Sequence, residues 1–314
     1  MTENKSTTSP ENTLSLNTDY AYWVRLAAIT SSSVALILVI IKLYAWLVSD
    51  SSAMLASTTD SILDLFASIM NIVILRFALA PADEEHKFGH GKAESLAGLV
   101  QAAFVLGSAI LLIFHGIERV MNPRLIVQSD IAIGVSIVAI VLTLFLVVFQ
   151  RYVIKRTGSI VISADALHYQ SDLLLNLGVL AAIFLSQGIW LQADGYFTIA
   201  VGVYLIFGAG QIIYQSVYQL MDHELSEEEQ MQIKNIILAH EHALGLHDLR
   251  TRQSGVHRFI QFHLELEDNL SLLEAHSIGD DIEAEICQAF APCEVFIHHD
   301  PTSVVSEELK AELS

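Results

Sequence analysis

The sequence has few of the residues that mark disulfide-rich or nucleic-acid-binding proteins. It contains five prolines and two cysteines in 314 residues, and 16 Lys and Arg against 35 Asp and Glu. Cys287 and Cys293 do not form a CxxC pair, so neither a thiolate zinc site nor a disulfide framework is expected. Both are predicted to be free thiols in a reducing cytosol. Residues 1–20 are polar and lack a short apolar core, which predicts no cleavable signal peptide.

Acidic residues are concentrated in the last third of the chain. Residues 1–221 carry 11 Lys and Arg against 15 Asp and Glu, whereas residues 222–314 carry 5 against 20. So acidic a segment argues against nucleic acid and anionic lipid surfaces as its partners. It also holds nine of the 13 histidines, and carboxylates with imidazoles are ligands for divalent metals. A solvated acidic surface is the alternative explanation.

Apolar sequence is what the chain has in excess. Hydrophobic residues make up 53% of it and the mean hydropathy is +0.50, above ordinary soluble composition. Each long apolar run could cross about 30 Å of hydrocarbon as a helix. The runs cover residues 22–48, 54–80, 96–121, 130–153, 164–189 and 193–220. We therefore predict an all-α six-helix membrane domain at 20–221 and a soluble domain at 222–301, with disordered tails at 1–19 and 302–314.

The distribution of basic residues predicts the orientation of the membrane domain. Short segments at 81–95 and 151–163 carry five of the Lys and Arg residues, whereas 49–53 and 186–194 carry none. Because basic residues favour the cytoplasmic side, both termini and the soluble domain are expected in the cytoplasm of a multi-pass protein. Lys42 lies within the first apolar run, near enough to its outer end to snorkel, and is predicted to be structural.

Two pairs of ionisable residues lie inside the predicted spans. Asp60 with Asp64, and His168 with Asp172, are each spaced i,i+4 and so share one helix face. Charge at bilayer depth is costly and usually marks an ion or proton pathway. Three carboxylates and one imidazole could hold a divalent transition metal, with Zn²⁺, Fe²⁺ and Mn²⁺ all compatible. Asp165 is predicted to be an N-terminal-turn residue that favours the helix dipole.

The soluble domain is predicted to contain its helices and strands in the order α-β-β-α-β. Helices are predicted at 226–240 and 271–290, and strands at 246–254, 257–267 and 293–299. The second strand alternates apolar and polar residues from Ile260 to Glu267, which is typical of a sheet with one covered face. The sequence therefore predicts a small α+β domain.

Several motifs together resemble the cation diffusion facilitators, and among them the bacterial zinc and ferrous-iron efflux pumps. The matching segments lie at residues 59–64, 86–94, 164–172, 246–252, 260–265, 274–276 and 297–301. They occur in the order found in the family and span about residues 20–301. The resemblance implies a metallochaperone-like soluble domain and a homodimer in a bacterial inner membrane.

The resemblance also assigns roles to individual residues. It implies a tetrahedral transport site that favours Zn²⁺ or Cd²⁺, a loop site facing the cytoplasm, and a binuclear zinc site near the dimer interface. The transport site would comprise Asp60, Asp64, His168 and Asp172; the loop site Asp83, His86 and His90; and the binuclear site His247, His263, His276, His298 and Asp300. His299 stands where close relatives have an amide.

Lys92 and Asp222 match charged positions at the family's membrane–cytoplasm junction. They are predicted to pair as a hinge, and two unrelated surface charges are the alternative.

The predicted function is export of Zn²⁺, with Fe²⁺ or Cd²⁺ as further candidates, by exchange for protons. An intramembrane metalloenzyme is less compatible because a catalytic zinc needs an open coordination position, whereas four ligands close the site. A membrane-anchored metal sensor would not need ligands inside the spans.

Overall fold

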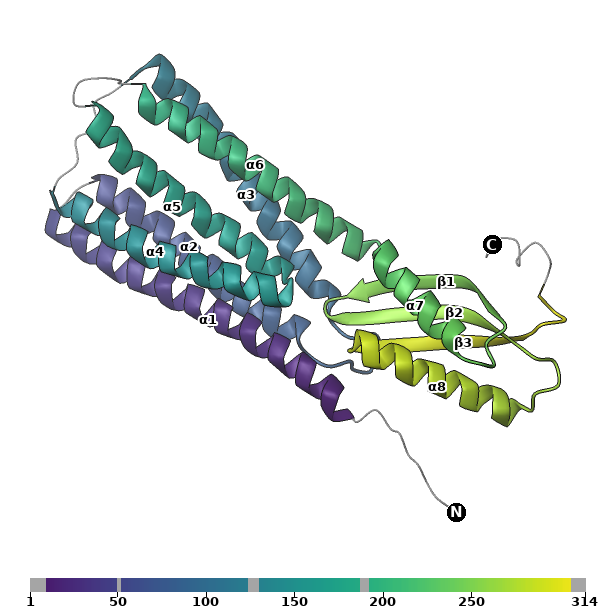
Figure 1. The fold of residues 1–314 in the computed structure, drawn as a ribbon. Helices are drawn as coiled ribbons and strands as arrows, with labels where there is room; N and C mark the ends of the chain where they lie inside the picture. Colours follow the sequence, from purple (N-terminus) through teal and green to yellow (C-terminus); the bar gives the residue numbers. More distant parts are fainter. Residues whose placement is uncertain (1–9, 50–51, 124–129, 187–191, 306–314) are drawn as a thin grey trace. The chain divides into compact units, whose positions relative to one another are not determined.

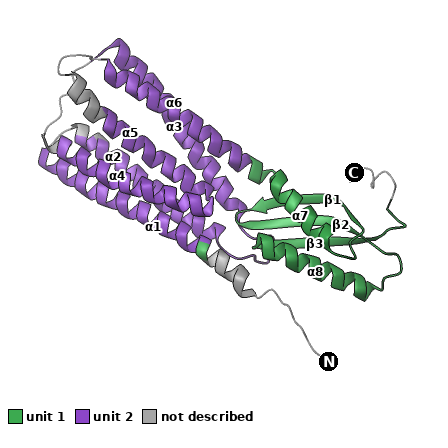
Figure 2. Ribbon diagram, in the orientation of Figure 1, with its two compact units in different colours: residues 1–19, 218–314 green, residues 20–217 purple. Residues whose placement is uncertain are grey.

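The computed structural model of the chain describes residues 10–49, 52–123, 130–186 and 192–305. They divide into two compact units (Figure 2). The membrane unit comprises residues 20–217, and the soluble unit comprises residues 218–314 together with 1–19. The predicted combination of a helical membrane domain with a small α+β domain is confirmed.

The membrane unit consists of six long helices that run side by side (Figure 1). Their bounds are α1 Pro10–Ser49, α2 Ser52–Ala78, α3 Lys92–Met121, α4 Asp130–Thr157, α5 Ile160–Ser186 and α6 Ala193–Leu220. Among the described residues, five of these helices, α1, α2, α3, α4 and α6, contain an apolar stretch long enough to span a membrane. α5 has 27 residues, about 40 Å of helix, but carries the polar residues of the predicted site. The described part of the membrane unit thus contains six helices, the number predicted.

The described residues include parts of both segments that were predicted as tails. α1 begins at Pro10, so helix replaces disorder over the second half of the segment predicted as a tail. Proline suits the first helical turn because it has no N–H to lose there. At the other end, the Thr302 N–H and hydroxyl both donate to the Leu266 carbonyl at 2.9 Å, and Val305 is buried. Residues 1–9 and 306–314 lie outside the described part of the chain.

α5 is the central helix of the membrane unit because its side chains enter three different apolar clusters. Leu167 packs with α3 and α6, Val161 with α1, α2 and α4, and Tyr169 with α1 and α4. A helix surrounded in this way buries polar residues on several faces, so each of them needs a partner. The position of α5 therefore explains why it carries the polar residues discussed below.

The start of α5 is tied to two other helices by the buried carboxylate of Glu94. Ser159 donates its hydroxyl to Glu94 Oε1 at 2.5 Å, and the Ile160 N–H donates to the same oxygen at 3.2 Å. Tyr20 of α1 donates to Glu94 Oε2 at 2.6 Å. An acceptor at a helix N-terminus satisfies N–H groups that have no intrahelical partner. Glu94, in the first turn of α3, thus fixes the N-terminus of α5.

The soluble unit is a three-stranded sheet with two helices against one face (Figure 1). Its elements are α7 Glu227–Ala239, β1 Gly245–Ser254, β2 His257–Leu266, α8 Leu272–Phe290 and β3 Cys293–Pro301. The strand order is β1-β2-β3, with β1 antiparallel and β3 parallel to β2. Both helices begin with a capping box, Ser226 with Glu229 and Ser271 with Glu274. The predicted α-β-β-α-β order is confirmed.

Cys287 and Cys293 form a disulfide, which corrects the prediction of free thiols. The last turn of α8 and the first residue of β3 are joined by a short turn, which brings the two Cα atoms to 5.5 Å. That separation lies in the usual range for a disulfide. The prediction considered spacing along the chain, whereas the helix-to-strand reversal determines the distance in space.

Candidate metal centres

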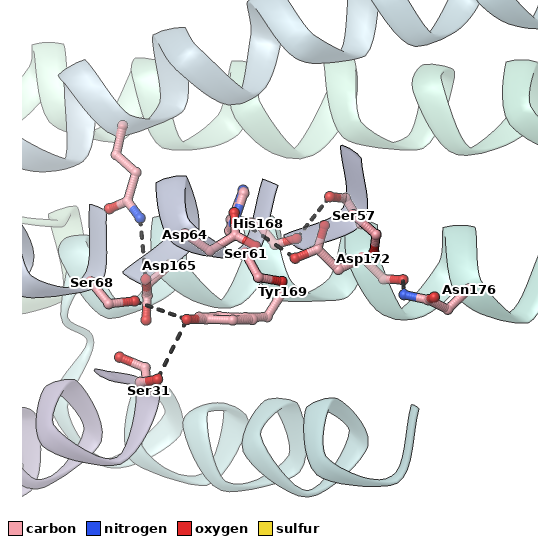
Figure 3. Close-up of polar contacts among 12 residues, drawn as sticks. Ser31, Ser57, Ser61, Asp64, Ser68, Asp165, His168, Tyr169, Asp172 and Asn176 are labelled. Atoms are coloured by element: carbon pink, nitrogen blue, oxygen red, sulfur yellow. Dashed lines mark hydrogen bonds and ion pairs between the residues drawn. The ribbon is translucent and has the colours of Figure 1, made fainter. Parts of the chain in front are cut away.

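Three of the four residues predicted for the transport site come together between α2 and α5. His168 Nε2 lies 2.9 Å from Asp64 Oδ1 and 3.7 Å from Asp172 Oδ2 (Figure 3). One ligand atom from each of the three residues fits within 4.8 Å of the others. All three side chains are only partly exposed. One imidazole and two carboxylates in such a group can bind a divalent transition metal.

Asp60 does not join this group. It is exposed and lies outside the set of ligand atoms that approach within 4.8 Å. The i,i+4 spacing places Asp60 on the same face of α2 as Asp64, but one turn of helix separates them. The sequence therefore predicted the correct helix face, whereas the distance between Asp60 and the other three ligands depends on how α2 packs against α5.

Asp165 has a different role from the one predicted. It lies in the second turn of α5, is buried, and accepts hydrogen bonds from three amides on other helices. Asn71 Nδ2 of α2 is at 3.0 Å, Gln101 Nε2 of α3 at 3.4 Å and Gln150 Nε2 of α4 at 2.7 Å. The carboxylate therefore joins four helices one turn before His168, and it lies beyond the first turn of α5, where the prediction had placed it.

Asp165→Leu is expected to lower the stability of the membrane unit. Leucine is of similar size but leaves three buried amide donors without an acceptor, at a cost on the order of 3 kcal/mol. The measurement is the thermal unfolding temperature of the purified protein in detergent. Asp194→Asn is the control, because Asp194 forms a partly exposed pair with Arg119 at the long distance of 3.9 Å. Equal unfolding temperatures for the two variants would contradict a stabilising role for Asp165.

The predicted loop site is assembled between α2 and α3. Asp83 Oδ1 lies 3.3 Å from His86 Nδ1, and Asp83 Oδ2 lies 3.3 Å from His90 Nε2. The His90 side chain is buried and its ring centroid is 4.5 Å from that of Phe77. The backbone N–H groups of His86 and Glu85 donate to Asp83 and hold the pKa of its carboxyl below the usual range. The three ligand atoms fit within 4.8 Å of one another, as a metal site requires.

The pairing of the three strands brings the predicted ligands of the soluble unit together. His247 of β1 stands opposite His263 of β2, which stands opposite His298 of β3, so the three imidazoles form one row. Asp300 Oδ2 lies 2.7 Å from His263 Nδ1 and 3.3 Å from His247 Nε2. His247, His263 and Asp300 form a group of ligand atoms within 4.8 Å. His298 Nε2 adjoins it, 3.2 Å from Asp300 Oδ1.

His276, the fifth residue of the predicted binuclear set, lies apart from the group. It is on α8, and its Nδ1 pairs with Asp280 Oδ1 at 3.5 Å. His299 points its Nε2 toward α8, where a Cβ on Gly279 would come within 2.6 Å of it. That nitrogen is buried and has no hydrogen-bond partner in the described structure. Burial and the neighbouring His276 and His298 lower the pKa of His299.

Sequence reasoning missed two acidic residues beside the soluble-unit group. Glu265 is buried and its Oε1 lies 3.3 Å from His247 Nδ1, so it can orient that imidazole. Asp248 Oδ2 is 3.9 Å from His263 Nε2 and has a φ of 50°, at a register shift in β1. Glu265 belongs to an alternating strand, and its polar position could have been read as a ligand partner. No signal in the sequence marks the irregularity at Asp248.

The structure leaves the predicted pairing of Lys92 with Asp222 untested. Lys92 belongs to the membrane unit and Asp222 to the soluble unit. Within its own unit, Asp222 Oδ2 lies 3.6 Å from Arg252 Nη1. Asp222 also has a φ of 55°, in the left-handed region.

The helical unit is apolar and holds a partly buried carboxylate–imidazole group, and the domain that follows holds another such group. This combination defines a membrane protein that handles metal cations. Residues 28–221 match the cation efflux transmembrane domain, and residues 225–302 match the cytoplasmic domain of cation efflux proteins. The chain therefore belongs to the cation efflux family, the cation diffusion facilitators. This confirms the resemblance found in the sequence.

Relatives match along nearly the whole chain. The cation-efflux pump FieF of Shewanella oneidensis is 50% identical over 285 residues, covering 91% of this chain and 96% of the relative. The FieF pump of Yersinia pestis strain Pestoides F is 45% identical over 296 residues, covering 94% and 99%. A solved structure of CzrB in its zinc form is 32% identical over 27% of this chain and 99% of that one, with a TM-score of 0.26.

The two FieF relatives are named cation-efflux pumps, and the family model is that of cation efflux proteins, so the chain is a transporter rather than an enzyme. Together with the apolar helices, they identify a multi-pass membrane protein that exports divalent cations.

Proposed function

We propose that the chain exports Zn²⁺, with Fe²⁺ and Cd²⁺ as further candidate substrates. The observation that carries this proposal is the group formed by Asp64, His168 and Asp172 between two membrane helices. Imidazole nitrogen favours zinc over the harder cations that prefer all-oxygen sites. Asp60, on the same face of α2, is the fourth ligand of the metal-loaded cage.

Export is coupled to protons in this proposal. Metal ligands bind in their deprotonated forms, so a metal that enters from the cytoplasm displaces protons from His168 and the carboxylates. Rocking of the helices then exposes the loaded site to the opposite side, where protons compete with the metal and reset the site. An inward-directed proton gradient therefore favours export.

The proposed assembly is a homodimer in the bacterial inner membrane, with both termini in the cytoplasm. The placement of basic residues supports this orientation, and the match to the cytoplasmic domain of cation efflux proteins supports dimerisation. Zinc bound to the soluble-unit group, with His276 as a further ligand, would have a structural or regulatory role. The loop group of Asp83, His86 and His90 would bind zinc from the cytoplasm.

Zinc flux in vesicles tests the proposed function. Purified protein reconstituted with a proton gradient is expected to move Zn²⁺ against the direction of proton flow, and flux should fall to the level of empty vesicles when a protonophore collapses the gradient. Flux of Zn²⁺ down its own gradient that is indifferent to the protonophore would indicate facilitated diffusion instead.

Lys92 and Asp222 are proposed to couple the two units as a hinge beneath the membrane. Metal binding at the soluble-unit group would then act on transport through this pair. Charge reversal in Lys92→Glu is expected to reduce zinc flux about fivefold, and the double variant with Asp222→Lys should recover part of that loss. Arg252→Gln is the control for loss of the observed Asp222–Arg252 pair. A double variant no better than the single one would show that the two residues do not work as a pair.

A further inference from the structure

Lys42 forms a contact inside the membrane unit that differs from the predicted snorkelling. Its ammonium donates to Ser61 Oγ at 2.7 Å and to the Ser57 carbonyl at 3.4 Å, both on α2. Ser61 is buried, with 1% of its surface exposed. The side chain therefore turns into the helix pair instead of extending to the end of α1 at Ser49.

The hydrogen bonds that the Lys42 ammonium makes within the described part of the chain go to neutral groups. Among the residues the structure describes, no carboxylate forms an ion pair with its ammonium. A partly buried ammonium bonded to a hydroxyl and a carbonyl has lost much of its hydration without gaining a carboxylate in direct contact. This arrangement is costly as a purely structural contact, because a neutral side chain would fill the same space with no charge to desolvate.

The same ammonium lies beside the carboxylates of the membrane site. Ser61 follows Asp60 directly and precedes Asp64 by three residues, a spacing that puts the Cβ atoms about 5–6 Å apart on one face of α2. Ser57 and Ser61 lie next to the group of Asp64, His168 and Asp172 (Figure 3). An electrostatic interaction also reaches from Lys42 to Asp172. The flexible four-carbon stem of lysine allows the ammonium to move between these partners.

We propose that Lys42 acts as a tethered cation, that is, a positive charge fixed to α1 that takes the place of the metal during transport. Its ammonium pairs with the carboxylates of the membrane site when the metal leaves and returns to Ser61 when the metal binds. This inference rests on the proposed function of the membrane site. Without metal, the carboxylates of Asp60, Asp64 and Asp172 repel one another, and a positive charge from α1 reduces that repulsion. The ammonium thereby competes with the metal and promotes its release.

The position of Lys42 in the fold fits a role in release. Lys42 contacts α2 closer to the connection between α1 and α2 than Asp64 does. That connection contains no Lys or Arg and is predicted to face away from the cytoplasm. The tethered cation thus lies on the side from which an exported metal departs.

Two substitutions with opposite expected effects test the proposal. Lys42→Met removes the charge and keeps an unbranched side chain, so the full-length protein should bind Zn²⁺ about tenfold more tightly at the membrane site and show about tenfold slower maximal flux. Ser61→Ala keeps the charge but removes its resting partner, so Zn²⁺ binding should weaken about threefold. Lys42→Arg keeps the charge and should retain binding closer to that of the unmodified protein.

The measurements are equilibrium Zn²⁺ binding in detergent and Zn²⁺ flux in vesicles, with Asp64→Ala defining the binding that belongs to the membrane site. Loss of packing alone would weaken both binding and flux, whereas the proposal requires tighter binding with slower flux. Unchanged affinity in Lys42→Met, or weakening of both quantities, would overturn the role of Lys42. If Lys42→Met does not fold, tighter or unchanged binding in Ser61→Ala overturns it. No difference between the unmodified protein and Asp64→Ala would instead reject the membrane site itself.

Discussion

Replacing Asp64 by alanine is expected to abolish metal transport. The substitution removes the carboxylate 2.9 Å from His168 Nε2 and leaves two of the three assembled ligands. Removal of a residue that hydrogen-bonds to a metal ligand, without binding the metal itself, weakens metal binding about 10- to 100-fold. Removal of a ligand should therefore weaken binding by at least about 100-fold. Zn²⁺ flux into vesicles and equilibrium binding in detergent are the measurements.

Thr59→Ala is the matched control for Asp64→Ala. Thr59 lies on the same helix, is exposed, and donates its hydroxyl only to the Leu55 carbonyl at 3.0 Å. Its loss should leave flux unchanged. Binding of zinc to the group of His247, His263 and Asp300 should survive in both variants, because that group lies in the other unit. Flux at the unmodified rate in Asp64→Ala would refute the assignment of Asp64 as a ligand.

His168→Asp is expected to shift the preference of the transporter from Zn²⁺ toward Mn²⁺. The change replaces the only nitrogen ligand of the assembled group and creates an all-oxygen site, which suits harder cations. We expect the ratio of zinc flux to manganese flux to fall by about 100-fold. Loss of one residue that merely hydrogen-bonds to a metal ligand can already have an effect of this size. The ratio is measured in vesicles with both metals at matched concentrations.

His115→Asp controls for the loss of a histidine elsewhere in the membrane unit. His115 is exposed on α3 and lies 4.0 Å from Glu118. Its replacement should leave the flux ratio unchanged. A His168→Asp variant that retains the original zinc preference would mean that the imidazole does not determine metal choice.

The helical class and the ligand pairs of the membrane unit could be read directly from the sequence. A long apolar run can bury its backbone in lipid only as a helix, so the number of helices follows from composition and length. The i,i+4 spacing of His168 and Asp172 is a property of one helix and needs no knowledge of its neighbours. The capping boxes and strand alternation of the soluble unit are local signals as well.

Residues whose role depends on two or more elements could not be assigned in this way. Asp165 accepts from amides on three other helices, which are distant in sequence. Cys287 and Cys293 meet because a helix and a strand reverse direction between them. Spacing along the chain carries no information about either distance, so both predictions were corrected.

The sequence alone determined the family, the six membrane helices, the order of elements in the soluble unit and most candidate ligands. Each of these depends on the composition, the hydrophobic periodicity or a motif of residues that are close together in the chain. Only the tertiary structure decided that α5 is central, that Asp60 lies outside the group formed by its neighbours, and that His247, His263 and His298 form one row. It also placed the Lys42 ammonium on Ser61. The physical reason is that helix packing and strand register set the distances between segments that are separated along the chain.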